Sequence, residues 1–501
     1  MRPLMNFMDK KNSEENISKL DLRSGVRRIT TNAASILASD ISNRITTFVI
    51  YIFVARFLGA LQFGQLALAL NLFNTFQIIS VAGLKSFVIR EVAKNHDKTE
   101  KFLVNASFVV SLTSIISITI LGIFVWIMEY SSAMSFTIII LSLGLIPFTL
   151  SHICDSLFQA QEKMQYITYS NLAVNVLKLS SVFLLLWTGG SLKQLIFLLF
   201  FSHIINLFLK LWFLLKQINR TGERVDLRYC LNMTKASFTF LGIDGVCAVM
   251  NCFNIILLSK FTGELGVGIY CAASQLMVPI ALLFESVAVS VYPAMCRSFE
   301  AGIEKLELRS ARVLEVLLAV VLPTTVALFF FADSLFLLIY GNKNFSQSTV
   351  VLQIIVWGLI FRAISKVLGI ALIASLKEKV TLQILLINMF TMFVSGFILI
   401  SRYGVVGGAL TTLIVSGVNF VQHYVHTTRI LSSLSLPHMF WKPAIAVTTM
   451  AIMFFSFPEL NIFVRGIIGS LIYLIVFAII LFITIGNLDQ LKVRYLTLKV
   501  E

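Results

Sequence analysis

Nearly all of this chain is divided into apolar stretches long enough to cross a membrane as a helix. A helix needs about 20 predominantly apolar residues to span the hydrocarbon core of a bilayer. With 57% hydrophobic and 13% charged residues, 501 residues cannot bury so much apolar surface in water, so lipid must be the solvent for most of the chain. The predicted spans are residues 31–53, 64–84, 102–127, 134–158, 168–188, 192–215, 234–259, 266–292, 313–340, 348–374, 381–400, 405–426, 441–457 and 462–485.

Lysine and arginine are unequally distributed between the loops that alternate along these spans. If the N-terminus lies inside, most of the 40 basic residues fall in the inner loops and tails. This asymmetry follows the positive-inside rule and predicts that both termini are cytoplasmic. It also accounts for the formal net charge of +15 without a nucleic-acid partner. The outer loops hold Arg56, Lys193, Lys260, Lys343, Arg402 and Arg465.

The chain contains an internal repeat with an offset of 204 residues, which places Thr30–Leu72 on Thr234–Leu276. Six predicted spans precede the second copy, so the first helix of each copy enters the membrane in the same direction. We therefore expect a parallel repeat about an axis along the membrane normal, an arrangement found in carriers. The matched pairs include Asp40 with Asp244, Gly59 with Gly263, and Gly64 with Gly268.

These features predict an all-α integral membrane protein with about 14 transmembrane helices, in two parallel-related six-helix lobes plus two extra C-terminal helices. Such lobes can rock around a central cavity. The predicted parts are a basic cytoplasmic N-terminal tail (1–30), an N-lobe of helices 1–6 (31–215), a cytoplasmic inter-lobe loop (216–233), a C-lobe of helices 7–12 (234–428), helices 13–14 (429–485) and a cytoplasmic tail (486–501).

Four cations within the spans are the candidate binding residues for an anionic substrate. Arg44, Lys178 and Arg362 fall near the middle of their helices, where a charge is costly. Lys366 follows Arg362 by four residues, so the two like charges share a helix face and an anion would relieve their repulsion. The alternative is that the cations pair with carboxylates inside the protein. Asp40, Asp155, Asp244 and Glu285 are available for such pairs.

Two further lysines, Lys210 and Lys235, lie close to predicted inner helix ends. We expect their amines to reach the membrane interface along their apolar stems.

Three of the carboxylates have a second interpretation. A buried carboxylate in a transporter can carry a proton or a sodium ion, which makes Asp40, Asp244 and Glu285 candidates for ion coupling. The alternative for the matched pair, Asp40 and Asp244, is that they accept hydrogen bonds that hold the fold.

Three prolines, Pro147, Pro279 and Pro323, interrupt predicted spans and are candidate hinges. Proline removes a backbone donor and bends a helix, which a rocking carrier can use, although static bends for packing are an equal alternative. The sequence contains no GxxxxGK[ST], HExxH or GxSxG motif. We expect no enzymatic activity, no cofactor and no metal.

Several motifs resemble bacterial polysaccharide exporters. They are Ala55-Arg56-Phe57-Leu58-Gly59 followed by Phe63-Gly64-Gln65-Leu66-Ala67, then Gly83-Leu84 with Ile89-Arg90-Glu91-Val92-Ala93, the loop Phe158-Gln159-Ala160-Gln161-Glu162-Lys163-Met164-Gln165-Tyr166, and Tyr403-Gly404-Val405-Val406-Gly407-Gly408-Ala409-Leu410. These motifs occur in the same order and at similar spacing over nearly the whole chain. The sequence therefore resembles Wzx-type lipid-linked oligosaccharide flippases of the multidrug/oligosaccharidyl-lipid/polysaccharide exporter superfamily.

This resemblance implies a V-shaped fold similar to that of the multidrug exporters (MATE-like). It implies a flippase that moves undecaprenyl-diphosphate-linked sugar repeat units to the outer leaflet of the bacterial inner membrane, for lipopolysaccharide O-antigen or other surface polysaccharide. Arg44 is similar to one of the helix 1 arginines of related peptidoglycan-precursor flippases, although Ile50 stands where those often have another arginine. The implied partners are the lipid-linked glycan and the bilayer, with other polysaccharide assembly proteins as further candidates.

Three other functions remain open from the sequence. A cation-coupled drug antiporter would share the fold, but its cationic substrates should disfavour a cavity with unpaired cations. A membrane glycan polymerase or glycosyltransferase would need acidic residues in sizeable outer loops, and those predicted here are short and acid-poor. A structural scaffold would not need charges in mid-membrane.

Overall fold

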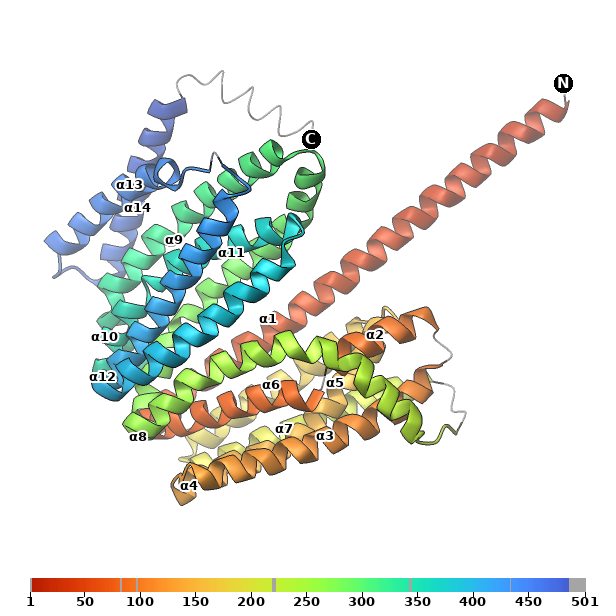
Figure 1. Cartoon of the computed structure of the whole chain (residues 1–501), viewed down its shortest axis with the longest axis horizontal. Coiled ribbons are helices and arrows are strands. Elements are labelled where there is room, and N and C mark those ends of the chain that lie inside the picture. Colours follow the sequence, from red (N-terminus) through yellow and green to blue (C-terminus); the bar gives the residue numbers. More distant parts are fainter. Residues whose placement is uncertain are drawn as a thin grey trace. The chain divides into compact units, whose positions relative to one another are not determined.

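The computed structural model describes the backbone of residues 2–81, 83–95, 98–218, 222–341, 345–432 and 434–485. It describes the side chains of the same residues except 2–30, 33, 238–244, 247, 251, 289, 378 and 485. All regular elements in this part of the chain are helices (Figure 1). They are α1 (Arg2–Val81), α2 (Leu84–Lys94), α3 (Thr99–Ile127), α4 (Ser132–Leu143), α5 (Leu145–Ala160), α6 (Gln165–Trp187), α7 (Leu192–Leu215), α8 (Leu227–Glu300), α9 (Ile303–Tyr340), α10 (Ser346–Ile355), α11 (Gly358–Ala374), α12 (Glu378–Thr428), α13 (Leu436–Ser456) and α14 (Ile462–Ile485).

Three of the helices are far longer than one membrane crossing. Within α1, α8 and α12 the helical backbone is interrupted at single glycines, with φ 81° at Gly59, 71° at Gly263 and 55° at Gly404. Each glycine stands where the sequence predicts an outer loop, and a residue without Cβ adopts these angles at little cost. Eleven described helices are long and apolar enough to cross a membrane, and these three are among them. The number of crossings stays a prediction.

The broken helices support the internal repeat. Gly59 and Gly263 are 204 residues apart and share the same backbone conformation, with ψ 179° and −172°. The fourth predicted span of each copy is also divided, between α4 and α5 at Gly144 and between α10 and α11 at Val356–Trp357. Pro147 lies in the first turn of α5, three residues after Gly144.

The chain forms two compact units. Unit 1 comprises Met1–Leu58 and Gln65–Cys252, and α5 lies at its centre because it packs against α2, α3 and α7. Unit 2 comprises Gly59–Gly64 and Phe253–Glu501. In unit 2, α11 packs against α9 and α12, while α13 and α14 pack on each other and on α9. The first part of α8 belongs to unit 1 and the rest of that helix to unit 2.

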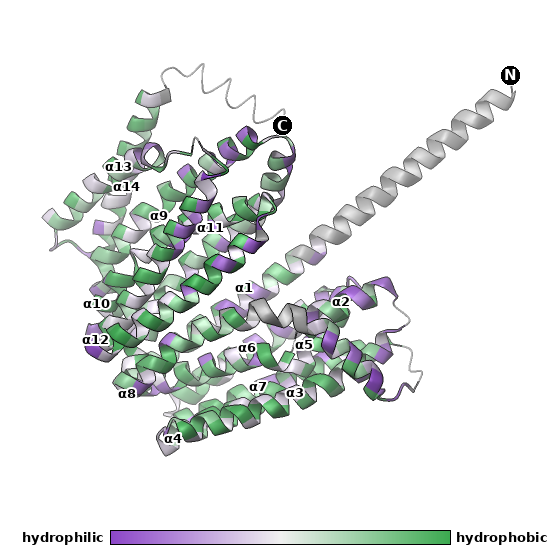
Figure 2. Cartoon of the chain, in the orientation of Figure 1, coloured by the Kyte–Doolittle hydropathy of each residue, from purple (hydrophilic) through white to green (hydrophobic). Residues whose placement is uncertain are grey.

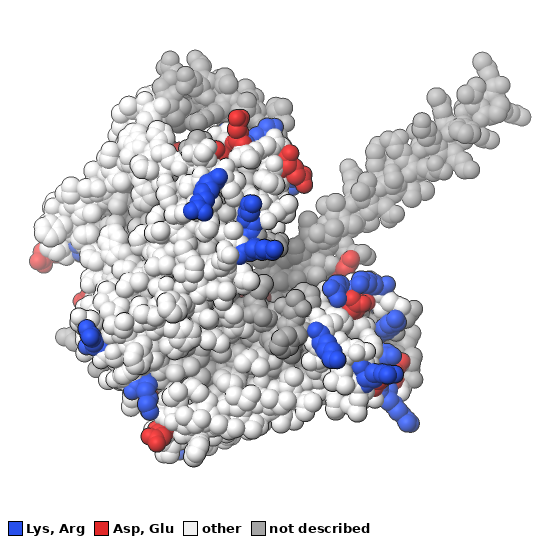
Figure 3. Space-filling model, viewed as in Figure 1, with Lys and Arg blue, Asp and Glu red and all other residues white. Residues whose placement is uncertain are grey.

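The distribution of charge along the helices is that of a membrane protein. Apolar residues cover the helix flanks and polar residues gather near the helix ends (Figure 2). On the visible face, lysine and arginine likewise collect at the ends of each unit (Figure 3).

Helix α2 lies in the predicted cytoplasmic loop between the second and third spans, and it is amphipathic. It buries Leu84, Val88 and Val92, while the exposed Lys94 donates a hydrogen bond of 3.0 Å to Glu91. The hydrogen bond from Lys94 lowers the pKa of Glu91.

Candidate functional site

Arg44, the predicted anion-binding cation of α1, is exposed and makes no ion pair or hydrogen bond with any side chain that the structure describes. Asp40, one turn earlier, is also exposed and forms no ion pair within the described residues. The pairing of these two residues, which their spacing allowed, is therefore not formed. The guanidinium keeps an uncompensated charge on the surface of unit 1.

Lys178, the predicted cation of α6, lies on the helix face that packs against this part of α1. Asn175, three residues earlier, donates hydrogen bonds to Ser42 Oγ (3.0 Å) and to Asn43 Oδ1 (2.8 Å), and Asn43 is adjacent to Arg44. Lys178 is half-buried and forms no ion pair in the described part of the chain. The structure thus brings two of the predicted cations onto neighbouring helices of unit 1.

A row of polar contacts, which the sequence analysis missed, runs along α1, α6 and α7 beside these cations. Asn171 donates to Ser39 Oγ (2.7 Å) and Thr168 donates to the carbonyl oxygen of Ser35 (2.7 Å). Asn206 of α7 extends the row with a bond of 3.2 Å to Asn171. The sequence did contain a signal for this row, because polar residues recur every three or four positions and so lie on one face of each helix. They are Ser35, Ser39 and Ser42 in the first helix and Thr168, Asn171 and Asn175 in the second.

Arg362 and Lys366 of unit 2 have different surroundings although they share a face of α11. The Lys366 Nζ lies 2.9 Å from Glu285 Oε1, and both side chains are half-exposed. The Arg362 Nε donates a hydrogen bond of 3.4 Å to Ser416 Oγ, and no carboxylate of the described residues neutralises it. Lys366, predicted to bind the substrate anion, and Glu285, predicted to couple an ion, therefore neutralise each other.

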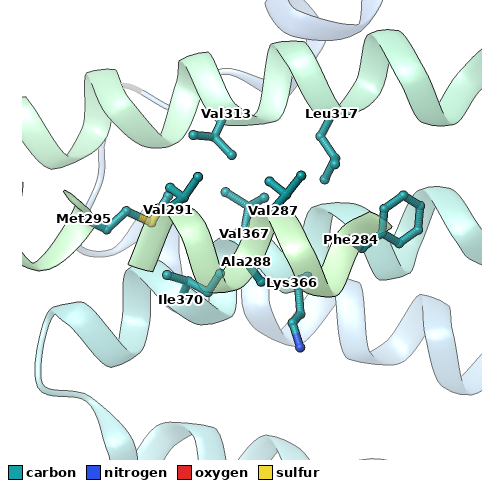
Figure 4. A pocket seen from close by; sticks show the side chains of 10 residues that line it. All are labelled: Phe284, Val287, Ala288, Val291, Met295, Val313, Leu317, Lys366, Val367 and Ile370. Atoms are coloured by element: carbon teal, nitrogen blue, oxygen red, sulfur yellow. The ribbon is translucent and has the colours of Figure 1, made fainter. Parts of the chain in front are cut away.

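Lys366 lines a pocket whose other side chains are apolar (Figure 4). It lies between α8, α9 and α11 and is lined by side chains such as Phe284, Val287 and Leu317. The Lys366 chain forms part of one side, and its amine points away from the apolar side chains (Figure 4). Apart from Lys366, this pocket offers no polar side chain to an anion, so it is a poor site for anion binding.

A second polar network, also missed from the sequence, lies one turn of α12 before Ser416. Asn254 of α8 donates to Tyr270 Oη (3.1 Å) and to Thr412 Oγ1 (3.2 Å), and the two hydroxyl oxygens are 2.7 Å apart. Asn254 and Tyr270 are buried. Each unit therefore places hydrogen-bonding groups close to a cation that has no carboxylate partner in the described part of the chain.

Lys210 shows that one sequence-based prediction was wrong. Its amine does not reach the membrane interface but is buried inside unit 1, 2.8 Å from the carboxylate of Asp155. The residue is 2% exposed, and the pair joins α7 to α5. Two aromatic neighbours, His152 and His203, pack against Phe148 in the same region, with ring centroids 4.4 and 5.5 Å from it. For this lysine, pairing with a carboxylate inside the protein, the alternative given for the span cations, is what the structure shows.

The roles predicted for Asp244 and for the three prolines stay predictions. The side chain of Asp244 lies outside the described residues, so its comparison with Asp40 stays a prediction. Pro279 and Pro323 lie inside α8 and α9, and their role as hinges, like that of Pro147, also stays a prediction.

Comparison with known proteins gives a consistent family. The family model described as "Polysaccharide biosynthesis protein" matches residues 29–299, more than half of the chain. The capsular polysaccharide biosynthesis protein CapF of Staphylococcus aureus is 24% identical over 402 residues, covering 76% of this chain and 98% of the relative. A candidate O-antigen transporter of Shigella flexneri is 20% identical over 374 residues, covering 72% of this chain and 88% of the relative.

Two solved structures have a similar fold. The lipid II flippase MurJ in an inward closed conformation has a TM-score of 0.72 at 16% identity, covering 91% of this chain and all of the other. An inward-facing multidrug resistance MATE transporter has a TM-score of 0.65 at 12% identity, covering 80% of this chain and all of the other. The fold is therefore the MATE-like membrane fold.

Proposed function

Because the chain belongs to the polysaccharide biosynthesis protein family, we propose that it is a flippase for lipid-linked oligosaccharides in a surface polysaccharide pathway. It is a multi-pass membrane transporter and not an enzyme. Its cargo is an undecaprenyl-diphosphate-linked repeat unit, which it carries from the cytoplasmic to the outer leaflet of a bacterial inner membrane by alternating access.

The observation that carries this proposal is the set of uncompensated cations within the spans. Arg44, Lys178 and Arg362 form no ion pair with any described residue. A charge in a membrane helix is costly unless it faces water or meets an opposite charge. A diphosphate supplies that charge, the nearby asparagine and serine side chains can bond sugar hydroxyls, and the polyprenyl tail can stay in lipid.

A cation-coupled drug antiporter is the second candidate, because MATE transporters share the fold. A positively charged drug would be repelled by the same three cations. The likeness to multidrug transporters is a likeness of fold alone, whereas the family match and the two sequence relatives concern polysaccharide. The flippase is therefore the better supported of the two.

The proposed orientation, with both termini in the cytoplasm, rests on charge. In unit 1, the turns α3–α4 and α6–α7 lie at the end opposite to α2 (Figure 1). Residues 128–131 and 188–191, which form these turns, contain no lysine or arginine. The segments at the α2 end are rich in both, which supports an inner location for that end. These cations are Lys85, Arg90, Lys94, Lys98, Lys101, Lys163, Lys216, Arg224 and Arg228.

The proposal predicts that Arg362→Ala stops the display of surface glycan. The loss of one charge-assisted contact to a phosphate costs about 1.5–3 kcal/mol, or roughly a tenfold to a hundredfold weaker interaction. The measurement is the amount of surface polymer in a flippase-deficient strain with a defined glycan, complemented by the variant at matched membrane level. Arg402→Ala, which removes an exposed arginine from α12 in the same unit, is the control and should display normal polymer. Normal display by Arg362→Ala would contradict the binding of an anion at this residue.

A further inference from the structure

The α8–α9 hairpin carries four cations around one surface hollow. Arg297 comes from the last turn of α8, and Lys305, Arg309 and Arg312 come from the first turns of α9. No acidic residue lines this hollow, and none of the four forms an ion pair with a residue that the structure describes. Four like charges held together in this way favour the binding of an anion.

The hairpin brings the backbones of these four residues together. Helices α8 and α9 are joined by Ala301 and Gly302, and Gly302 has φ 125°, which a glycine adopts readily. The Arg309 Nη1 donates a hydrogen bond of 3.0 Å to the carbonyl oxygen of Ala294, which ties α9 back to α8. The four residues therefore belong to two packed helices and not to a loop, and the Arg309 side chain is fixed by this hydrogen bond.

Charges of opposite sign are separated around α9. Lys305, Arg309 and Arg312 follow one another at intervals of four and three residues, so they share one helix face. The acidic residues lie on another face, lining a second hollow beside the start of α13 that includes His438 and Met439. They are Glu304, Glu307 and Glu315. The cationic face is thus free of the carboxylates that are nearest to it in sequence.

The same face of α9 continues as exposed apolar surface. Val316 and Val320 follow Arg312 at intervals of four residues and are 68% and 47% exposed. Leu308, beside the cations, is 51% exposed. In a membrane protein, a cationic patch followed by exposed apolar residues can bind a lipid. The anionic headgroup contacts the cations, and the acyl chains lie along the valines.

We propose that the α8–α9 hairpin binds the phosphate headgroup of an anionic phospholipid in the adjoining leaflet. The buried side of α9, which includes Leu306, Ser310 and Leu314, is opposite to the cationic face. The proposal therefore places the headgroup on the exposed surface of unit 2, whereas transported cargo has to enter the protein. The site is separate from Arg362 and is independent of the identity of the cargo.

The test compares the phospholipids retained by the purified full-length protein. Wild-type protein in detergent is incubated with phosphatidylglycerol or with phosphatidylcholine, and bound lipid is counted by native mass spectrometry. We expect retention of phosphatidylglycerol to fall about tenfold or more in Lys305→Gln/Arg312→Gln, because each cation near an anionic headgroup contributes substantially to binding. This variant leaves Arg309 in place, so the contact with Ala294 is kept.

Two controls make the result decisive. Glu304→Gln/Glu315→Gln changes two charges on the other face of α9 and should not reduce retention. Inorganic phosphate at millimolar concentration should not displace phosphatidylglycerol, because it has no chains to lie along Val316 and Val320. Equal retention of phosphatidylcholine, unchanged retention in Lys305→Gln/Arg312→Gln at equal thermal stability, or displacement by inorganic phosphate would each overturn the proposal.

Discussion

Lys210→Met is expected to lower the stability of the protein by about 3–5 kcal/mol, because it leaves the Asp155 carboxylate buried without its cation. The two groups are 2.8 Å apart, and their side chains are only 2% and 9% exposed. The measurement is thermal unfolding of the detergent-solubilised protein, followed by fluorescence-detected gel filtration.

The matched control for this variant is Lys235→Met. Lys235 is also a lysine of unit 1 near a predicted helix end, but it is exposed. Removal of a surface charge changes stability by about 0.5 kcal/mol or less. A midpoint for Lys235→Met close to that of the wild type would therefore show that the loss in Lys210→Met comes from burial and not from the change of net charge.

The double variant Lys210→Met/Asp155→Leu distinguishes the contribution of the ion pair from the cost of leaving one of its charges buried alone. Replacement of a buried ion pair by apolar residues of similar size is often neutral or stabilising, so most of the lost stability should return. If the double variant is as unstable as Lys210→Met, the two residues contribute to stability by more than the neutralisation of each other's charge. A contact with His152 or His203 is then the next one to test. If Lys210→Met is stable by itself, Asp155 is not buried as a charge.

The success of the sequence analysis at the level of fold has a simple physical origin. A membrane crossing needs a minimum length of apolar helix, and that requirement is local, so α3, α6, α7, α13 and α14 lie close to their predicted spans. The offset of 204 residues likewise predicted that Gly59 and Gly263 would be equivalent. It did not show that the connection between the two helical parts would be reduced to a single non-helical residue, because glycine has the same sequence signal in a long loop and in a tight connection.

The questions that the sequence analysis left open at the site concern contacts between helices. Asp155 is 55 residues from Lys210, and Glu285 is 81 residues from Lys366, so neither pair is visible along a single helix. The local pair that was visible, Asp40 with Arg44, is not formed in the described part of the chain. A charge inside a span predicts that a partner or a substrate is needed, and only the packing of the helices decides which of the two is present.

The internal repeat leads to the second prediction, which concerns the contact of its two copies within unit 2. A Cβ added at Gly64 would overlap the carbonyl oxygen of Glu264 and lie 2.8 Å from the backbone nitrogen of Gly268. A Cβ added at Gly268 would overlap the carbonyl oxygen of Ala60 and lie 3.1 Å from the backbone nitrogen of Gly64. Each residue is 204 positions from its equivalent, so the contact is reciprocal, as expected of a two-fold relation between the copies.

Gly64→Ala and Gly268→Ala are each expected to cost about 3 kcal/mol, because the new methyl group meets backbone atoms and not a side chain that could rotate away. The measurement is again the midpoint of thermal unfolding, together with the amount of protein in the membrane. Gly122→Ala is the control: a Cβ at Gly122 has no atom within 4 Å, and alanine favours a helix more than glycine does. Its stability should match or slightly exceed that of the wild type.

The double variant Gly64→Ala/Gly268→Ala tests whether the two glycines belong to one contact. If they do, the first methyl group already separates the two backbones, so the second methyl group costs less stability than it does alone. The stability loss of the double variant is then smaller than the sum of the losses of the two single variants. Additive costs would mean that each glycine is required by its own surroundings. Stable single variants with normal display of surface glycan would contradict the close approach itself. Stable variants that no longer display glycan would instead show that the contact serves the movement of cargo, because the protein folds without it but fails to transport.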